Sequence, residues 1–299
     1  HTGRATRASV AVAVILTLTK AIVWWMSGSV ALLASMADSL LDLTASLTVY
    51  FSVRYAAEPA DAEHRYGHGK AEAFAGIMQA IFVAASAALL LREGISHIIN
   101  PVPIQAGGWA LGVMALSIAL TLVLVWVQTR ALEKTGSIAV EGDRAHYFSD
   151  LGANVAVMIG IAGATMMGWL WLDAAAALAV AAWLGWTAWG VARGAAAQLM
   201  DQELDDADRE QIRDIVLSDP RILDMHELRT RASGPLVHIQ FHMALDPDLK
   251  LQDAHRILVK CERRLLDAFP AADILIHADP HGVAEPHGTE FFSAEENPA

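Results

Sequence analysis

Six long apolar stretches occupy the first 200 residues, and they constrain the fold more than any other feature of the sequence. The stretches cover residues 8–29, 32–55, 71–98, 107–131, 141–167 and 173–195. A helix needs about 20 apolar residues to cross the hydrocarbon core of a bilayer. The segments from Ala110 to Val127 and from Leu151 to Leu172 contain no lysine or arginine. The sequence therefore predicts a six-helix transmembrane bundle in residues 1–200.

The charge of the chain changes at residue 200. Residues 1–200 carry 12 acidic and 11 basic side chains, whereas residues 201–299 carry 21 acidic and 10 basic ones. We expect a separate acidic domain at 201–283 and a disordered tail at 284–299, which contains proline and glutamate. The net charge of −12 disfavours nucleic acid as a partner, because phosphate binding needs clustered lysine and arginine. A cationic ligand fits this charge better.

Basic residues lie mainly at those ends of the six stretches that are expected to face one side of the membrane. The connections at 26–31, 100–108 and 168–173 contain no lysine or arginine, whereas the opposite ends carry Arg4, Arg7, Arg54, Arg65, Lys70, Arg130, Lys134, Arg144 and Arg193. Under the positive-inside rule this pattern predicts that both termini are cytoplasmic. Lys20 lies inside the first stretch, and we expect it to reach the outer interface or to pair within the bundle.

The acidic domain shows two helical and three strand patterns. We expect a helix at 205–218, strands at 222–231 and 236–245, a helix at 250–268 and a strand at 272–278. Val237, Ile239, Phe241 and Met243 alternate with polar residues, as in a strand with one buried face. The order predicts a small α/β sandwich with an antiparallel sheet.

Two pairs of ionisable residues lie inside predicted spans. Asp38 and Asp42 are four residues apart, as are His146 and Asp150, so each pair lies on one helical face. A carboxylate within a span costs roughly 2.5–3.5 kcal/mol to insert and therefore needs a compensating partner. One nitrogen and three oxygens form a tetrahedral ligand set suited to Zn²⁺. Either pair taken alone also fits a structural role, such as pairing with Lys20 or lying at a helix end.

Two further clusters carry metal-ligand types. Asp61, His64 and His68 follow a D-x₂-H-x₃-H spacing between the second and third spans, although exposed histidines can also be simply solvated. The acidic domain contains His226, His238, His242, His255, His277, Asp279 and His281. A single cysteine, Cys261, excludes an intrachain disulfide and a CxxC zinc site. Any metal must therefore use histidine and carboxylate ligands.

Five ordered motifs connect these clusters to a known family. They are S-M-A-D-S-L-L-D at 35–42, H-R-Y-G-H-G-K-A-E at 64–72, H-Y-F-S-D at 146–150, H-E-L-R-T-R-A-S-G-P at 226–235 and I-H-A-D-P at 276–280. With them the chain resembles the cation diffusion facilitator family, in its bacterial zinc and iron efflux type, from Arg7 to Val283.

The resemblance implies a homodimer in the bacterial inner membrane that exports divalent metal in exchange for protons. It also implies a ferredoxin- or metallochaperone-like cytoplasmic domain of α-β-β-α-β order. Three metal sites follow from it: a transport site of Asp38, Asp42, His146 and Asp150, a loop site of Asp61, His64 and His68, and a cytoplasmic site of His226, His242, His255, His277 and Asp279. In this resemblance His242 bridges two metals, and Lys70 and Asp201 form a charge interlock at the dimer junction. His238, His281 and His287 have no counterpart.

We therefore expect a transporter whose partners are metal ions, protons, the bilayer and a second copy of the chain. The imidazole of His146 favours Zn²⁺, with Cd²⁺, Fe²⁺ and Co²⁺ also suitable, over Mn²⁺ and Mg²⁺. An alternative is a metal-sensing membrane scaffold whose cytoplasmic domain binds metal without transport. A membrane hydrolase is a third possibility, but the sequence offers no HExxH, nucleophile motif or phosphate loop, so we expect no enzyme.

Overall fold

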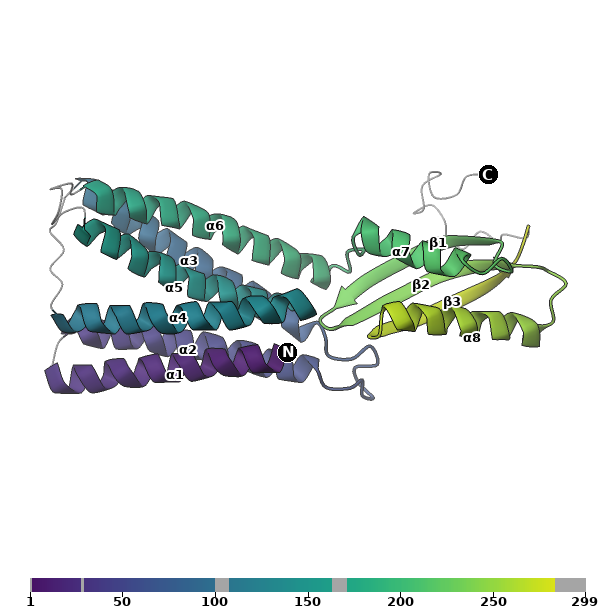
Figure 1. The fold of residues 1–299 in the computed structure, drawn as a ribbon, viewed down its shortest axis with the longest axis horizontal. Coiled ribbons are helices and arrows are strands. Elements are labelled where there is room, and N and C mark those ends of the chain that lie inside the picture. The colour runs from purple at the N-terminus through teal and green to yellow at the C-terminus, as the bar shows by residue number, and fades with distance from the viewer. Residues whose placement is uncertain (1, 28–29, 100–107, 163–170, 283–299) are drawn as a thin grey trace. The chain divides into compact units, whose positions relative to one another are not determined.

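The computed structural model describes residues 2–27, 30–99, 108–162 and 171–282, and the chain divides into two compact units, His1–Ala196 and Ala197–Ala299 (Figure 1). Within the described residues, the first unit is built from α1 (Thr2–Ser27), α2 (Val30–Ala56), α3 (Ala71–Ile99), α4 (Gly108–Thr135), α5 (Ile138–Ala162) and α6 (Trp171–Leu199). The predicted six-helix bundle is confirmed.

The sequence explains where these helices run and where they stop. None of the six contains proline, whereas Pro59, Pro101 and Pro103 lie in the connections between them. Proline removes a backbone donor and clashes inside a helix, so this distribution favours long uninterrupted helices. Four segments of described residues are long and apolar enough to cross a membrane: Thr2–Ile22, Ala71–Ile99, Ala115–Thr135 and Ala174–Leu199. Helices α2 and α5, which are not among the four, carry the predicted transport-site residues.

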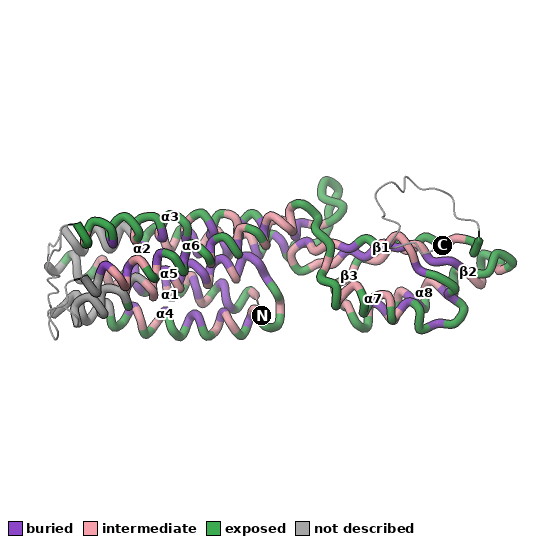
Figure 2. Tube along the Cα trace, turned by 90° about the horizontal axis from the view of Figure 1, so that it is seen from above, coloured by how far each residue is buried: buried purple, intermediate pink, exposed green. Residues whose placement is uncertain are grey.

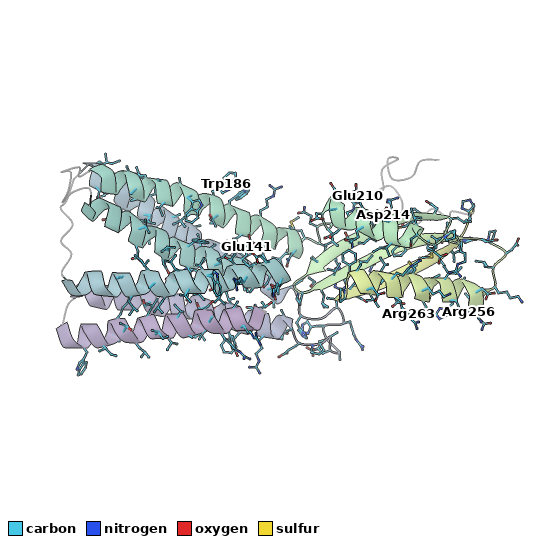
Figure 3. All side chains as sticks on the ribbon, in the orientation of Figure 1. Glu141, Trp186, Glu210, Asp214, Arg256 and Arg263 are labelled. Atoms are coloured by element: carbon cyan, nitrogen blue, oxygen red, sulfur yellow. The ribbon has the colours of Figure 1, made fainter. Side chains whose placement is uncertain are left out.

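The bundle turns large apolar side chains outward and small ones inward. Leu18, Phe74 and Trp186 are exposed, and Trp186 projects from the outer side of α6 (Figure 3). The inner positions are mostly alanine and other small residues, which form the buried side of the helices (Figure 2). Small residues let membrane helices approach closely. An outer surface of this kind suits contact with lipid.

Helix α5 contacts α2, α3 and α4 and so occupies the centre of the helix contacts. Its approach to α3 depends on Gly142, because a Cβ placed there would lie 2.8 Å from the Cβ of Gln79. The turn before α5 depends on Gly136, whose φ of +57° lies in the left-handed region that glycine adopts without strain. These two glycines help to set the position of the His146 and Asp150 side chains.

The second unit contains α7 (Asp206–Leu217), β1 (Asp224–Ser233), β2 (Leu236–Leu245), α8 (Leu251–Ala268) and β3 (Ala272–Pro280). The predicted α-β-β-α-β order is confirmed. The carboxylate of Asp205 caps α7 by accepting a hydrogen bond from the Asp208 N–H. The sheet has the order β1-β2-β3.

The sheet is mixed, which corrects the expectation of an antiparallel one. β1 pairs with β2 in antiparallel register, but β2 and β3 run parallel. The physical reason is the connection: a short turn joins β1 to β2, whereas α8 lies between β2 and β3. A helical crossover returns the chain to the end of the sheet at which β2 begins, so the next strand runs parallel to β2.

The core of this unit lies on one face of the sheet. Ile239, Phe241 and Met243 are buried together with Ile212 of α7 and Ile257 of α8. Side chains alternate across a strand, so His242 lies on the other face of β2. The alternation predicted for β2 is therefore confirmed, and it leaves one face of the sheet to polar side chains.

A partly exposed ion pair follows α7 and is approached by an arginine of α8. The Arg221 guanidinium donates two hydrogen bonds to the Asp219 carboxylate, at 2.6 and 2.9 Å, and Arg264 of α8 lies 3.7 Å from the same carboxylate. The hydrogen bonds from Arg221 hold the pKa of Asp219 at about 2. This pair stabilises the folded chain at pH values above the usual pKa of an aspartate.

Candidate metal centres

Helices α2 and α5 bring three of the four predicted transport-site residues together. The Asp42 Oδ1 lies 3.0 Å from the His146 Nε2. Ligand atoms of Asp42, His146 and Asp150 all lie within 4.8 Å of one another. The side chain of Asp38, the fourth residue, lies outside the described residues. Asp42 of α2 and the His146 and Asp150 pair of α5 therefore converge on a single place in the bundle, although Asp42 and His146 are 104 residues apart in sequence.

The chemistry of this cluster suits a cation. The His146 side chain is 7% exposed, and its Nδ1 has no hydrogen-bond partner among the described residues. Imidazole nitrogen and carboxylate oxygen are both common zinc ligands. One buried imidazole and two half-buried carboxylates within reach of a single ion, in helices where carboxylates are costly, constitute a candidate metal site.

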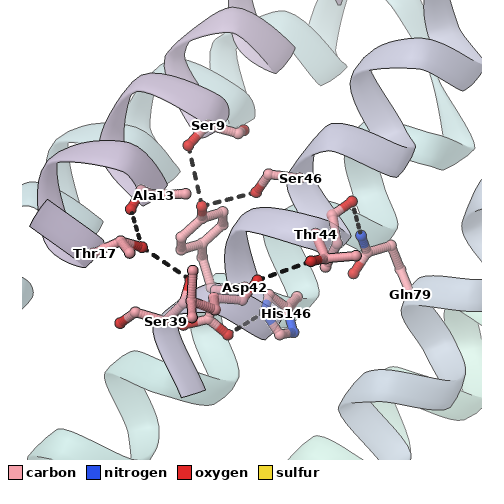
Figure 4. A network of polar contacts seen from close by, with 12 residues as sticks. Ser9, Ala13, Thr17, Ser39, Asp42, Thr44, Ser46, Gln79 and His146 are labelled. Atoms are coloured by element: carbon pink, nitrogen blue, oxygen red, sulfur yellow. Dashed lines mark hydrogen bonds and ion pairs between the residues drawn. The ribbon is translucent and has the colours of Figure 1, made fainter. Parts of the chain in front are cut away.

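A network of buried polar groups supports the cluster (Figure 4). The Tyr147 hydroxyl lies 2.9 Å from the Ser46 hydroxyl and donates to the Ser9 carbonyl at 3.2 Å. The Gln79 amide donates to the Ala45 carbonyl, which joins α3 to α2. These bonds connect α1, α2, α3 and α5 around the metal ligands. They fix the helix register that places His146 beside Asp42.

A further buried carboxylate, which was not predicted from the sequence, lies on α5. Asp143 is 1% exposed and accepts hydrogen bonds from Ser9 and Gln128. It lies three residues before His146 and seven before Asp150, and this spacing on one helical face was the signal that could have identified it. Glu72 at the start of α3 is also buried, and it accepts a hydrogen bond from Ser137. Both lie outside the ligand cluster itself.

The loop between α2 and α3 brings its three predicted ligands together. The Asp61 carboxylate lies 3.3 Å from the His64 Nδ1 and 3.3 Å from the His68 Nε2. Backbone N–H groups of His64 and Glu63 donate to Asp61, and chiefly the His64 bond holds the pKa of this carboxyl below its usual range. His68 is buried against Tyr55. The loop therefore presents three ligands, one carboxylate and two imidazoles, at a site where Asp61 and His64 are exposed and His68 is buried.

The cytoplasmic site takes its form from strand register. His226 of β1, His242 of β2 and His277 of β3 are direct neighbours across the sheet. Asp279 lies beside them: its carboxylate is 2.8 Å from the His242 Nδ1, 3.3 Å from the His226 Nε2 and 3.1 Å from the His277 Nε2. Ligand atoms of His226, His242 and Asp279 lie within 4.8 Å of one another, with His277 beside Asp279, and this set suits Zn²⁺ or a similar ion.

A bulge in β1 adds a residue that the sequence analysis missed. The register shifts between His226 and Arg229, and Glu227 has a φ of +49°. The Glu227 carboxylate lies 3.6 Å from the His242 Nε2. Adjacent residues of a regular strand face opposite sides, so sequence alone gave no signal that Glu227 would lie beside the histidines.

Other predicted residues lie elsewhere. His255 is exposed on α8, which packs on the opposite face of the sheet from His242. His238 lies 3.1 Å from Asp273, and His281 is exposed after β3. His287 and the predicted tail at 284–299 lie outside the described residues.

The remaining charged residues singled out by the sequence lie in both units. The Lys20 ammonium donates a hydrogen bond to the Ser39 hydroxyl at 2.6 Å, so it has a partner within the bundle. Lys70 belongs to the first unit and Asp201 to the second, where Asp201 lies 3.2 Å from Arg231. The charge interlock of Lys70 and Asp201 stays a prediction.

Comparison with known proteins covers nearly the whole chain. The family model described as the cation efflux transmembrane domain matches residues 6–200, and that of the cation efflux protein cytoplasmic domain matches residues 204–281. The chain is 43% identical over 276 residues to the cation-efflux pump FieF of Shewanella oneidensis, covering 92% of this chain and 93% of the relative.

A second curated relative and one solved structure are also similar to this chain. FieF of Salmonella schwarzengrund is 40% identical over 288 residues, which cover 96% of each chain. The solved metal-bound C-terminal domain of the CzcD transporter from Thermotoga maritima is 23% identical and matches 27% of this chain and 100% of that domain, with a TM-score of 0.25. From the family models and the full-length relatives, the chain belongs to the cation diffusion facilitator family of cation efflux proteins.

Proposed function

We propose that this multi-pass membrane protein exports Zn²⁺ in exchange for protons. The observation that carries the proposal is the convergence of Asp42, His146 and Asp150 on one site between membrane helices. Asp38 lies one helical turn before Asp42 on α2 and is the proposed fourth ligand. Two relatives that are named cation-efflux pumps support the direction of transport.

Exchange follows from competition for the same atoms. Three carboxylates in a membrane need compensating positive charge, which either a divalent ion or protons can supply. A metal ion binds deprotonated carboxylates and neutral imidazole, so zinc binding releases protons and proton binding releases zinc. A higher proton concentration outside the cell therefore favours zinc release on that side of the membrane. One site that alternates between the two sides suffices for antiport.

Ligand type bears on which metal is carried. The imidazole of His146 supports Zn²⁺, Cd²⁺, Fe²⁺ and Co²⁺, whereas an all-oxygen site suits Mn²⁺ and Mg²⁺. His146→Asp is therefore expected to weaken discrimination against Mn²⁺. Among the softer ions, we propose Zn²⁺ as the principal substrate because a four-ligand site of nitrogen and carboxylate oxygen fits its tetrahedral preference.

The other two centres are proposed to regulate transport. The donors at the cytoplasmic site, three imidazoles and Asp279, fit a resident Zn²⁺ ion, and so do Asp61, His64 and His68 in the loop. We propose that the chain works as a homodimer with both termini cytoplasmic, in the bacterial inner membrane. A bound cation would reduce self-repulsion in a second unit where 21 acidic side chains face 10 basic ones over residues 201–299. Tighter association of the two cytoplasmic domains follows.

The test is metal flux into proteoliposomes driven by an imposed pH gradient. The full chain is expected to accumulate Zn²⁺ when the gradient favours proton counterflow, and Asp42→Ala is expected to abolish this flux. Glu141→Gln is the matched control, because it removes a carboxylate from the same helix as His146 without touching the ligand cluster. Flux that persists in Asp42→Ala contradicts the site assignment, and an unsubstituted chain that binds zinc without flux supports the sensing scaffold instead.

A further inference from the structure

A pocket of about 390 Å³ opens between α1 and α4, away from all three metal centres. Its floor includes Ala5 and Ala131, two buried alanines that pack together in one apolar cluster. Three basic side chains surround it: Arg4 from α1 and Arg130 and Lys134 from α4. The pocket therefore combines an apolar base with a positively charged rim.

The charges around the pocket are not balanced by the protein. Glu133 is the one acidic side chain in its lining, against three cations. Among the described residues, no carboxylate forms an ion pair with Arg4, Arg130 or Lys134. The Arg130 guanidinium instead lies over the Trp126 ring, 4.0 Å from its centroid. An excess of two positive charges at a concave surface favours an anionic ligand.

The order of residues along α4 places the pocket at a membrane interface. Trp126, Arg130 and Lys134 are spaced by four residues, so they follow one face of the helix toward its end. All three lie in the C-terminal part of the apolar span Ala115–Thr135, with the tryptophan deepest in the span. Tryptophan is enriched at the level of lipid headgroups, and long basic side chains extend from there into water. Arg4 lies at the corresponding end of the span Thr2–Ile22.

We propose that this pocket binds the phosphate headgroup of an anionic phospholipid. Arg4, Arg130 and Lys134 would contact the phosphate, and Trp126 would contact the first part of an acyl chain. Basic pockets between membrane helices bind such headgroups, and the apolar base and interfacial tryptophan distinguish this pocket from a site for a free anion. A bound lipid would hold α1 against α4 and so stabilise the half of the bundle that supplies Ser9 and Gln128 to the network near the metal ligands. The proposal depends on membrane insertion and not on the metal that is carried.

The test compares lipid binding by charge-matched variants of the full chain. Native mass spectrometry in detergent would follow retention of phosphatidylglycerol, with phosphatidylcholine as the neutral lipid. The pocket variant combines Arg4→Gln, Arg130→Gln and Lys134→Gln, and the control combines Arg7→Gln, Arg54→Gln and Arg193→Gln. Each basic group that lines the pocket and contacts the bound headgroup is expected to change affinity about fivefold, whereas the control residues do not line the pocket. We expect phosphatidylglycerol to bind the pocket variant at least tenfold more weakly, with less than a twofold change in the control.

A second variant guards against loss of fold, because it acts in the opposite direction. Glu133→Gln removes the acidic group of the lining and is expected to tighten phosphatidylglycerol binding about fivefold. A misfolded chain would not bind more tightly. Equal weakening in the pocket variant and its control overturns the proposal, as does unchanged or weaker binding in Glu133→Gln. Displacement of phosphatidylglycerol by an equal concentration of inorganic phosphate, or equal retention of phosphatidylcholine, overturns the assignment to an anionic lipid.

Discussion

Replacing His242 by alanine is expected to remove most of the stability that zinc gives to the cytoplasmic unit. His242 lies between His226 and His277 in the sheet register, and its Nδ1 is 2.8 Å from the Asp279 carboxylate. It is therefore the one imidazole with a neighbour on both sides. Its loss removes the central nitrogen of the cluster while the hydrophobic core on the other face of β2 stays intact.

The magnitude follows from ligand binding to the folded state. At zinc 100 times above Kd, binding stabilises the folded unit by about 2.7 kcal/mol. If loss of His242 weakens zinc about 100-fold, at the upper end of what a disturbed metal shell costs, about 0.4 kcal/mol remains. For a unit of this size, 1 kcal/mol corresponds to a shift of roughly 4–8 °C in Tm. The zinc-dependent rise in Tm is thus expected to shrink by roughly 9–18 °C.

The assay is thermal unfolding of the full chain with and without zinc, together with zinc flux in proteoliposomes. His281→Ala is the matched control, because His281 is exposed and its backbone N–H donates a hydrogen bond to the Leu245 carbonyl. The alanine variant keeps this backbone hydrogen bond. The control should keep the full zinc-dependent rise in Tm. The same rise in His242→Ala would falsify the cytoplasmic metal site. Loss of zinc binding at the transmembrane site in that variant would contradict the independence of the two centres.

Three further predictions concern stability and the loop. Asp219→Asn should destabilise the chain by about 1–2 kcal/mol at neutral pH. Because the pKa of Asp219 in the folded chain is about 2 against an ordinary 3.8, the stability difference between the two chains should shrink as pH drops from 4 to 2. Denaturant unfolding measures this difference, and a difference that stays constant across that pH range would contradict the role of the ion pair. Gly142→Ala should lower the free energy of unfolding by about 1–3 kcal/mol, since its Cβ would lie 2.8 Å from that of Gln79. Gly185→Ala, whose Cβ would meet open space, should be tolerated, and thermal unfolding of both variants in detergent compares them. Asp61→Asn should weaken zinc binding at the loop by at least tenfold in calorimetry while transmembrane binding persists; equal loss at both places would refute separate sites.

The transport-site pairs show how far local spacing extends. The i, i+4 rule places His146 and Asp150 on one face of α5 without any knowledge of the fold. It says nothing about which helix α5 faces. The contact between Asp42 and His146 arises because α5 packs closely against α3 at Gly142 and also contacts α2. Asp143 was overlooked for the same reason, since only the approach of α1 and α4 reveals that Ser9 and Gln128 surround it.

In the cytoplasmic unit, too, the sequence predicts side-chain direction but not which strands pair. Alternation along β2 predicts that His242 faces away from the core, because side-chain direction in a strand is a local property. The parallel pairing of β2 with β3 depends on the crossover through α8, and the arrival of Glu227 beside His242 depends on a bulge in β1. His255 carries the expected residue type but lies on α8, over the opposite face.

By itself the sequence determined the two kinds of domain, the six membrane helices, the α-β-β-α-β order and the residue types able to bind metal. These features depend on hydrophobicity, periodicity and spacing along the chain, which are local. Only the tertiary structure decided that Asp42, His146 and Asp150 share one site, that three histidines align across β1, β2 and β3, and that basic residues of α1 and α4 surround a pocket. Helix packing and strand register set these contacts between distant segments, and neither is encoded in the spacing of any one motif.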